Sequence, residues 1–132
     1  MYRRWCEKKN KGQSMVETAL VLPVILLILL GIVDFGFLFN NYLVIDNASR
    51  EGARSAAVGS TDTVITSTVK GMTASLNQAK LKTTINPAGS GRVKGSQVTV
   101  TVEYDYSLLT PIIGLVIPNP VHLTANTVMR IE

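Results

Sequence analysis

The chain has 132 residues, of which 46% are hydrophobic, and a formal net charge of +4. This length leaves room for one folded domain at most, in addition to a membrane segment. The whole positive excess lies in residues 1–12, whereas residues 13–132 carry eight basic and eight acidic side chains. The remainder of the chain is therefore neutral, which argues against a nucleic-acid-binding face.

Residues 1–12 form a basic leader. It holds five Lys or Arg residues against the single acid Glu7, together with the only cysteine of the chain, Cys6. Basic residues beside a hydrophobic span are retained in the cytoplasm, so we expect the N-terminus inside and the C-terminal part outside. The outer part then has no cysteine with which to form a disulfide.

The stretch that follows is predicted to be a membrane-spanning helix. No charged residue occurs in the sixteen positions from Thr18 to Val33, and apolar side chains continue beyond Asp34 to Phe39. A hydrocarbon core of about 30 Å needs about 20 apolar residues in a helix. A secretory signal peptide shares the basic start, but this run is longer than a typical signal core and no small-residue cleavage site follows it. We expect an anchor that Pro23 kinks. At its outer end we expect Asp34 to be solvated, in preference to the alternative of an intramembrane partner.

The junction between leader and span reads KGQSMVE over residues 11–17. A glycine at position 12 lets an extended backbone enter a protease cleft at the membrane surface. Cleavage after Gly12 would create an α-ammonium group at Gln13, which Glu17 would neutralise on a neighbouring chain during assembly. Ser14 and Glu17 also fit a capping box at a helix start, and this alternative involves no cleavage.

The helical pattern continues beyond the span. Residues 13–58 are predicted to form one rod of transmembrane helix and stalk, about 69 Å long at 1.5 Å per residue. Arg50 lies four residues after Asp46, and Arg54 lies three residues after Glu51, and both helical spacings suit ion pairs. Many of the residues around them are Ala, Ser or Gly, which let a helix or a sheet approach closely. Two interpretations stay open: Arg50, Glu51 and Arg54 contact another subunit, or this segment packs on its own domain and they form a charged rim.

Residues 59–132 are predicted to form a small exported α+β domain. After a break at residues 59–62 we expect a second helix to about residue 80 and a short strand over about 81–85. Apolar and polar residues alternate over 98–106 and again over 121–131, which predicts two further strands. Residues 111–120 form an apolar connector between them. The expected fold class is α+β, with a small antiparallel sheet covered on one face by the stalk and the second helix.

No grouping of residues predicts a catalytic, metal or cofactor site. His122 has no Cys or His neighbour in the sequence, and the acids Glu103 and Asp105 fit the solvent face of a solubilising edge strand. The glycines at 89 and 91 lack the strand-to-helix context of a nucleotide site. We therefore predict no enzyme activity, no cofactor, no metal and no small-molecule substrate.

Three sequence blocks stand in a distinctive order: GQSMVETALVLP at 12–23, GIVDFG at 31–36 and NASREGAR at 47–54. They resemble the TadE-like family, which comprises minor pilins or pseudopilins of the bacterial tight-adherence (Tad/Flp) pilus. The chain's ending, LTANTVMRIE at 123–132, is also similar to endings in that family. Gln13 stands where ordinary type IV pilins carry phenylalanine.

The resemblance implies a pilin-like fold and a place in the bacterial cytoplasmic membrane, with the C-terminal domain on the periplasmic or extracellular side. It also implies that a prepilin peptidase cleaves between Gly12 and Gln13, and that Glu17 guides assembly with other pilins and Tad assembly proteins. The alternative function is that of an uncleaved, membrane-anchored binding or scaffold module of the cell envelope.

Overall fold

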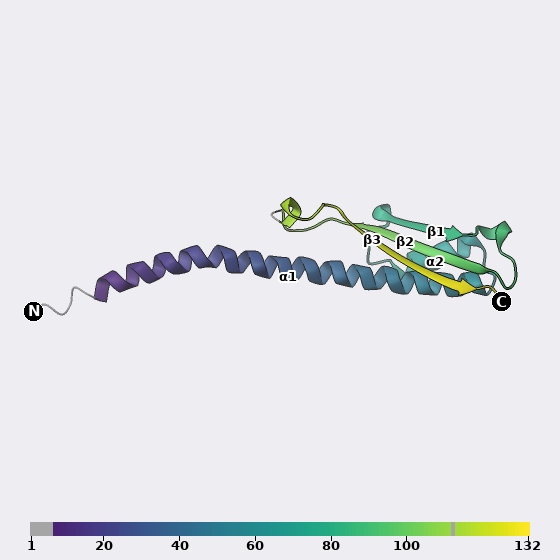
Figure 1. The fold of residues 1–132 in the computed structure, drawn as a ribbon, viewed down its shortest axis with the longest axis horizontal. Coiled ribbons are helices and arrows are strands. Elements are labelled where there is room, and N and C mark those ends of the chain that lie inside the picture. Colours follow the sequence, from purple (N-terminus) through teal and green to yellow (C-terminus); the bar gives the residue numbers. More distant parts are fainter. Residues whose placement is uncertain (1–6, 112) are drawn as a thin grey trace, which may run out of the picture.

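The computed structural model describes residues 7–111 and 113–132. Its helices are α1, Glu7–Ala57, and α2, Asp62–Met72, and its strands are β1, Leu81–Asn86, β2, Gln97–Tyr106, and β3, Val121–Arg130. Helix α1 is a long rod, and the sheet and α2 are gathered along its C-terminal half (Figure 1). This arrangement confirms the predicted α+β class of a long helix, a second helix and a small antiparallel sheet.

Helix α1 is continuous from the leader into the stalk. Pro23 lies inside it, and the helix bends within its first third (Figure 1). A proline removes one backbone hydrogen bond and is a common cause of such a bend. The helix ends at Ala57, and Gly59 follows with φ +83°, a left-handed conformation that glycine adopts without strain.

The face of α1 that meets the domain is a single stripe. Its members recur three or four residues apart, which places them on one side of a helix. They are the buried or half-buried residues Gly31, Asp34, Leu38, Asn41, Ile45, Ala48 and Gly52. The domain therefore covers α1 from the end of the stalk back to Gly31.

Helix α2 is shorter than the sequence predicts, because it ends at Met72 rather than near residue 80. The next residue, Thr73, is buried, and its hydroxyl donates to the carbonyl of Val69 at 2.8 Å. The side-chain amide of Gln78 then donates to the carbonyl of Thr73 at 2.7 Å. These bonds satisfy carbonyl groups at the end of the helix and turn the chain toward β1.

The sheet is antiparallel in the order β1-β2-β3, so β2 is its central strand. Alternate residues of β2 are buried: Val98, Val100, Val102, Tyr104 and Tyr106. The other face of β2 carries Glu103 and Asp105, which are half-buried between the neighbouring strands. The expectation that these acids mark a sheet edge is wrong, because both edges of β2 are paired.

The core lies between this sheet and the two helices. Ile65 and Val69 of α2 and Ile45 of α1 are completely buried against β2 and its neighbours. A Cβ atom added at Gly52 would lie 2.9 Å from Cγ2 of Val69 and 3.2 Å from Cγ1 of Val100. The backbone of α1 therefore approaches the sheet more closely here than any larger side chain permits.

The connection between β2 and β3 leaves the sheet and runs back along α1 toward the chain's N-terminal end (Figure 1). It contains a short 3-10 turn, Ile113–Leu115. Cδ1 of Ile113 lies 3.5 Å from the position that a Cβ atom would take at Gly31. Besides the stalk, the domain thus also contacts the outer part of the apolar run of α1.

Candidate functional site: leader junction, span and stalk

The junction at Gly12 and Gln13 is helical and exposed. Both residues lie inside α1, and no atom outside the local helix backbone lies within 4 Å of a Cβ atom added at Gly12. Residues 1–6 of the predicted leader lie outside the described residues. A peptidase that cuts between Gly12 and Gln13 would therefore have to unwind a helical turn that is sterically accessible.

The capping box considered for Ser14 and Glu17 is not formed, because α1 begins at Glu7 and passes through both residues. The carbonyl of Ser14 accepts a hydrogen bond from the hydroxyl of Thr18 at 2.9 Å, as in a helix interior. Glu17 is exposed, four residues after Gln13 and on the same side of the helix. Its position at the start of the uncharged run leaves it available to another chain.

The apolar run of α1 is exposed throughout its N-terminal part. Residues 12–30 are all exposed, and the helix is long and apolar enough to cross a membrane. A soluble core helix with this composition would be buried by the rest of the chain. The exposure of this segment therefore supports single-pass membrane anchoring by α1.

Asp34 is not solvated, contrary to the sequence-based expectation. Its carboxylate is 2% exposed and accepts the backbone N–H groups of Leu109 at 3.0 Å and Thr110 at 2.9 Å. The hydroxyl of Tyr106 points to the same carboxylate at 3.5 Å. The expectation failed because these donors lie more than 70 residues further along the chain, at the end of β2 and in the β2–β3 connection.

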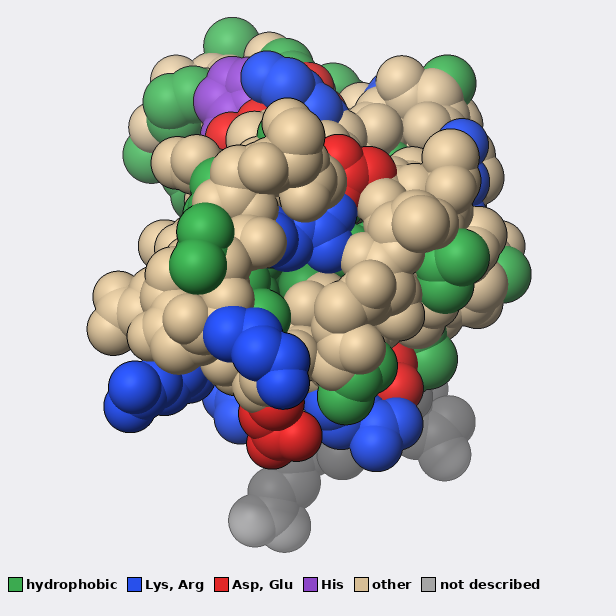
Figure 2. Space-filling view, turned by 90° about the vertical axis from the view of Figure 1, so that its right-hand side faces the viewer, with side chains coloured by type: hydrophobic (Ala, Val, Ile, Leu, Met, Phe, Trp, Pro, Cys, Tyr) green, Lys and Arg blue, Asp and Glu red, His purple; other side chains and the backbone are tan. Residues whose placement is uncertain are grey.

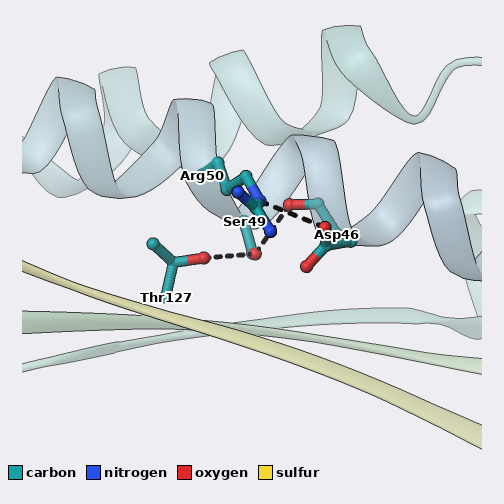
Figure 3. A network of polar contacts seen from close by, with 4 residues as sticks. All are labelled: Asp46, Ser49, Arg50 and Thr127. Carbon is teal, nitrogen blue, oxygen red and sulfur yellow. Dashed lines mark hydrogen bonds and ion pairs between the residues drawn. The ribbon is translucent and has the colours of Figure 1, made fainter.

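The small residues of the stalk pack on the chain's own domain. Ala48, Ser49 and Ala53 are completely buried beneath the sheet. The hydroxyl of Ser49 bonds the hydroxyl of Thr127 in β3 at 2.8 Å and donates to the carbonyl of Asp46 at 2.9 Å (Figure 3). The small-residue face that could have received another subunit is therefore occupied within this chain.

The charged residues of the stalk lie beside this packed face. Arg50 donates to Asp46 at 3.1 Å, and Arg54 pairs with Glu51 at 2.7 Å, as the helical spacing predicts (Figure 3 shows the first pair). Hydrogen bonding from Arg54 lowers the pKa of the Glu51 carboxyl below its usual value. Exposed pairs of this kind contribute little to stability. The same exposure keeps Arg50 and Arg54 accessible to another protein.

An ion pair that the sequence analysis missed lies at the end of the domain remote from the span. Arg92 pairs with Asp62, and its side chain is only 7% exposed. Its guanidinium donates to the carbonyl of Ser60 at 2.6 Å, and Asp62 also accepts the N–H of Gly89 at 3.0 Å. These contacts tie the β1–β2 loop to the turn between the helices. Arg92 and Asp62 lie 30 residues apart and meet only because the two loops pack together, so no local sequence pattern predicts this ion pair.

The domain end seen in Figure 2 has a mixed surface, where basic and acidic side chains are interspersed with uncharged polar atoms and scattered hydrophobic ones. On the outer face of the sheet, Glu103 pairs with Lys82 at 3.6 Å and Asp105 pairs with Nδ1 of His122 at 2.5 Å. These cross-strand pairs are of the kind that stabilises a sheet. Within the described part of the chain, no group of three or more His, Cys, Asp or Glu residues is placed to hold a metal ion.

The profile of a family described as "TadE-like protein" matches residues 12–54. The matched segment begins at Gly12 and includes Glu17, the apolar run, Asp34 and the charged residues of the stalk as far as Arg54. Comparisons with curated proteins and with solved structures give no match. The family match over residues 12–54 agrees with the resemblance of the three sequence blocks to the TadE-like family.

Proposed function

We propose that this chain is a pilin-like subunit, of the minor pilin or pseudopilin kind, that takes part in assembling a Tad-type adhesion pilus. The observation that carries the proposal is the TadE-like match over residues 12–54, which lies on one long helix. The part of that helix at residues 12–30 is exposed, as a segment that packs against lipid and then against other helices would be. Assembly through such a helix needs no catalytic site.

In this proposal α1 anchors the chain in the cytoplasmic membrane, with the leader inside and the C-terminal domain on the periplasmic or extracellular side. A prepilin peptidase cleaves between Gly12 and Gln13, and the helix that remains begins at the new α-ammonium group. Glu17 of one chain then neutralises the α-ammonium group of a neighbour, because an isolated carboxylate is costly at the edge of the hydrocarbon. Other pilins and Tad assembly proteins are the partners, and Arg50, Glu51 and Arg54 offer an exposed charged surface to them.

A second candidate is an uncleaved, anchored scaffold or binding module of the cell envelope. The observation that favours it is the unbroken helix through Gly12 and Gln13, which offers no extended segment to a protease. In that case the leader persists, and the outer face of the sheet is the surface that meets a partner.

The intact mass of the membrane-extracted chain separates the two candidates. In cells with an active prepilin peptidase we expect the mass to fall by that of residues 1–12, and in cells without the peptidase we expect it to stay unchanged. A Gly12→Leu variant serves as the matched control, because a bulky residue before the scissile bond blocks the cleft that glycine admits. An unchanged mass of the wild-type chain in both strains would overturn the cleaved-pilin proposal in favour of the scaffold.

A further inference from the structure

The connection between β2 and β3, residues 107–120, is an apolar segment that the pilus proposal does not explain. No charged side chain occurs in it, although Asp105 and His122 flank it closely. Four of its large hydrophobic residues are well exposed: Leu109 at 68%, Leu115 at 86%, Val116 at 86% and Ile117 at 45%. Contiguous exposed apolar residues of this kind mark an interaction site.

The place where this segment meets α1 lies inside the expected membrane span. A hydrocarbon core of about 30 Å takes about 20 helical residues, so a span that begins after Glu17 ends near Phe37. The connection contacts α1 at Gly31 and Asp34, before that end. The uncharged part of α1 that is exposed, residues 18–30, is only about 20 Å long at 1.5 Å per residue. A bilayer of normal thickness therefore reaches the connection.

The carboxylate of Asp34, which lies on α1 within the expected span, is satisfied by the connection itself. Asp34 receives the N–H groups of Leu109 and Thr110, and both Asp34 and Thr110 are buried. A carboxylate in hydrocarbon is tolerated when it faces the protein interior and has partners. The contact thus lowers the free-energy cost of placing the Asp34 carboxylate, and with it this part of α1, in the hydrocarbon of the membrane.

Part of the backbone of the connection is satisfied within the protein. Hydrogen bonds within the protein are made by the N–H groups of Leu108, Leu109, Thr110, Val116 and Ile117. Prolines at positions 111, 118 and 120 have no N–H group to satisfy. Irregular backbone is excluded from lipid mainly because its free N–H and C=O groups are costly there. In this segment, five N–H groups are thus satisfied and three prolines have none, which lowers that cost without removing it.

We infer that residues 107–111 and 113–120 form an apolar wedge that enters the membrane leaflet on the side of the domain, next to the span. The wedge carries Leu115 and Val116 into the acyl chains, while Asp34 holds its base against α1. Lipid is the occupant, because the exposed face of the wedge continues the exposed apolar surface of α1. The opposite end of the domain, in Figure 2, has charged and polar side chains that suit water. The inference rests on α1 as a membrane span and goes beyond its role in a pilus.

Depth measurement by spin labelling tests this inference on the full chain. In a Cys6→Ser background, a nitroxide is attached to Leu115→Cys and the chain is reconstituted in vesicles of phosphatidylethanolamine and phosphatidylglycerol. Power saturation then gives the ratio of collisions with oxygen, which dissolves in lipid, to collisions with a neutral nickel chelate, which stays in water. Matched labels at Ile28→Cys in the span and Val128→Cys on the outer face of β3 replace hydrophobic residues that are also exposed.

We expect the ratio at position 115 to exceed that at position 128 several-fold and to approach that at position 28. A ratio at position 115 equal to that at position 128 would overturn the wedge. Protection at position 115 that disappears on dilution with excess lipid would also overturn it, in favour of contact with a second copy. A water-accessible label at position 28 would overturn the span itself and with it the wedge. A water-accessible label at position 115 alone would overturn the wedge but would leave the pilus proposal, which the mass measurement tests, unaffected.

Discussion

Asp34 is the residue whose surroundings decide how the domain sits on the helix. Its two carboxylate oxygens each accept a backbone N–H group from the connection, so the side chain replaces water for two adjacent amides. A buried donor that loses its acceptor costs about 1–3 kcal/mol. Replacement of this one side chain should therefore loosen a segment that lies far away in sequence.

We predict that Asp34→Leu speeds amide hydrogen exchange at Leu109 and Thr110, with a loss of local stability of about 1–3 kcal/mol. Asp34→Asn, which keeps one acceptor oxygen, should have the smaller effect. The measurement is hydrogen exchange of the full chain in micelles, with the exposed-face variant Asp105→Asn as control. Unchanged exchange at both amides in Asp34→Leu would contradict the bonding described for this carboxylate.

Gly52 is the residue where helix and sheet approach most closely. We predict that Gly52→Ala destabilises the folded domain by about 1–3 kcal/mol, because its methyl group would overlap side chains of Val69 and Val100. The control is Gly71→Ala in α2, because no atom outside the local helix backbone lies within 4 Å of a Cβ atom added at Gly71. Alanine should raise the free energy of unfolding there by up to about 1 kcal/mol, because its helix propensity is higher than that of glycine. Denaturant midpoints from near-ultraviolet circular dichroism would compare the two. Equal midpoints would show that the core accommodates the methyl group.

The hydroxyl pair of Ser49 and Thr127 joins the stalk to β3. A double-mutant cycle with Ser49→Ala and Thr127→Val should give a coupling free energy of about 0.5–1.5 kcal/mol, the usual net value of one hydrogen bond. Unfolding free energies of the four chains supply the cycle. If the two changes in unfolding free energy are strictly additive, each hydroxyl finds another hydrogen-bond partner when the other hydroxyl is removed.

At the scale of elements, the parts that depend on local pattern are predictable from the sequence. Continuous hydropathy identifies the apolar helix, and alternation of period two identifies β2 and β3 close to their observed bounds. The end of α2 is not predictable in this way, because Thr73 and Gln78 end the helix through side-chain bonds to carbonyl groups. The central place of β2 depends on strand pairing, which alternation alone does not specify.

One variant distinguishes the two interpretations of the charged stalk residues, contact with another subunit or a charged rim. Arg54→Ala should change the unfolding free energy by less than about 0.5 kcal/mol, because exposed ion pairs contribute little. If Arg54 also contacts another subunit, the same variant should reduce pilus assembly while the chain still accumulates in the membrane. Normal assembly by Arg54→Ala would leave it as a charged rim.

At the scale of the whole molecule, the chain consists of one rod and one small domain that lies along the rod's C-terminal half (Figure 1). Charge, hydropathy and helical period all change along the sequence, and the division into leader, span with stalk and exported domain stays a prediction from these changes. The sequence does not predict the second contact, where the connection of β2 and β3 reaches back to Gly31 and Asp34. That contact depends on tertiary packing between segments more than 70 residues apart. The leader junction, by contrast, is predicted from the sequence alone, and both the junction and its processing stay predictions.

The number of pili per cell tests the proposed role most directly. Cells that lack this chain would be complemented with the wild type, with Glu17→Ala or with an exposed-face control, Glu103→Gln, and their pili would be counted by electron microscopy at matched membrane levels of the chain. We predict few or no pili without the chain and with Glu17→Ala, and normal numbers with the wild type and the control. Normal pilus numbers in cells that lack the chain would contradict a role in pilus assembly.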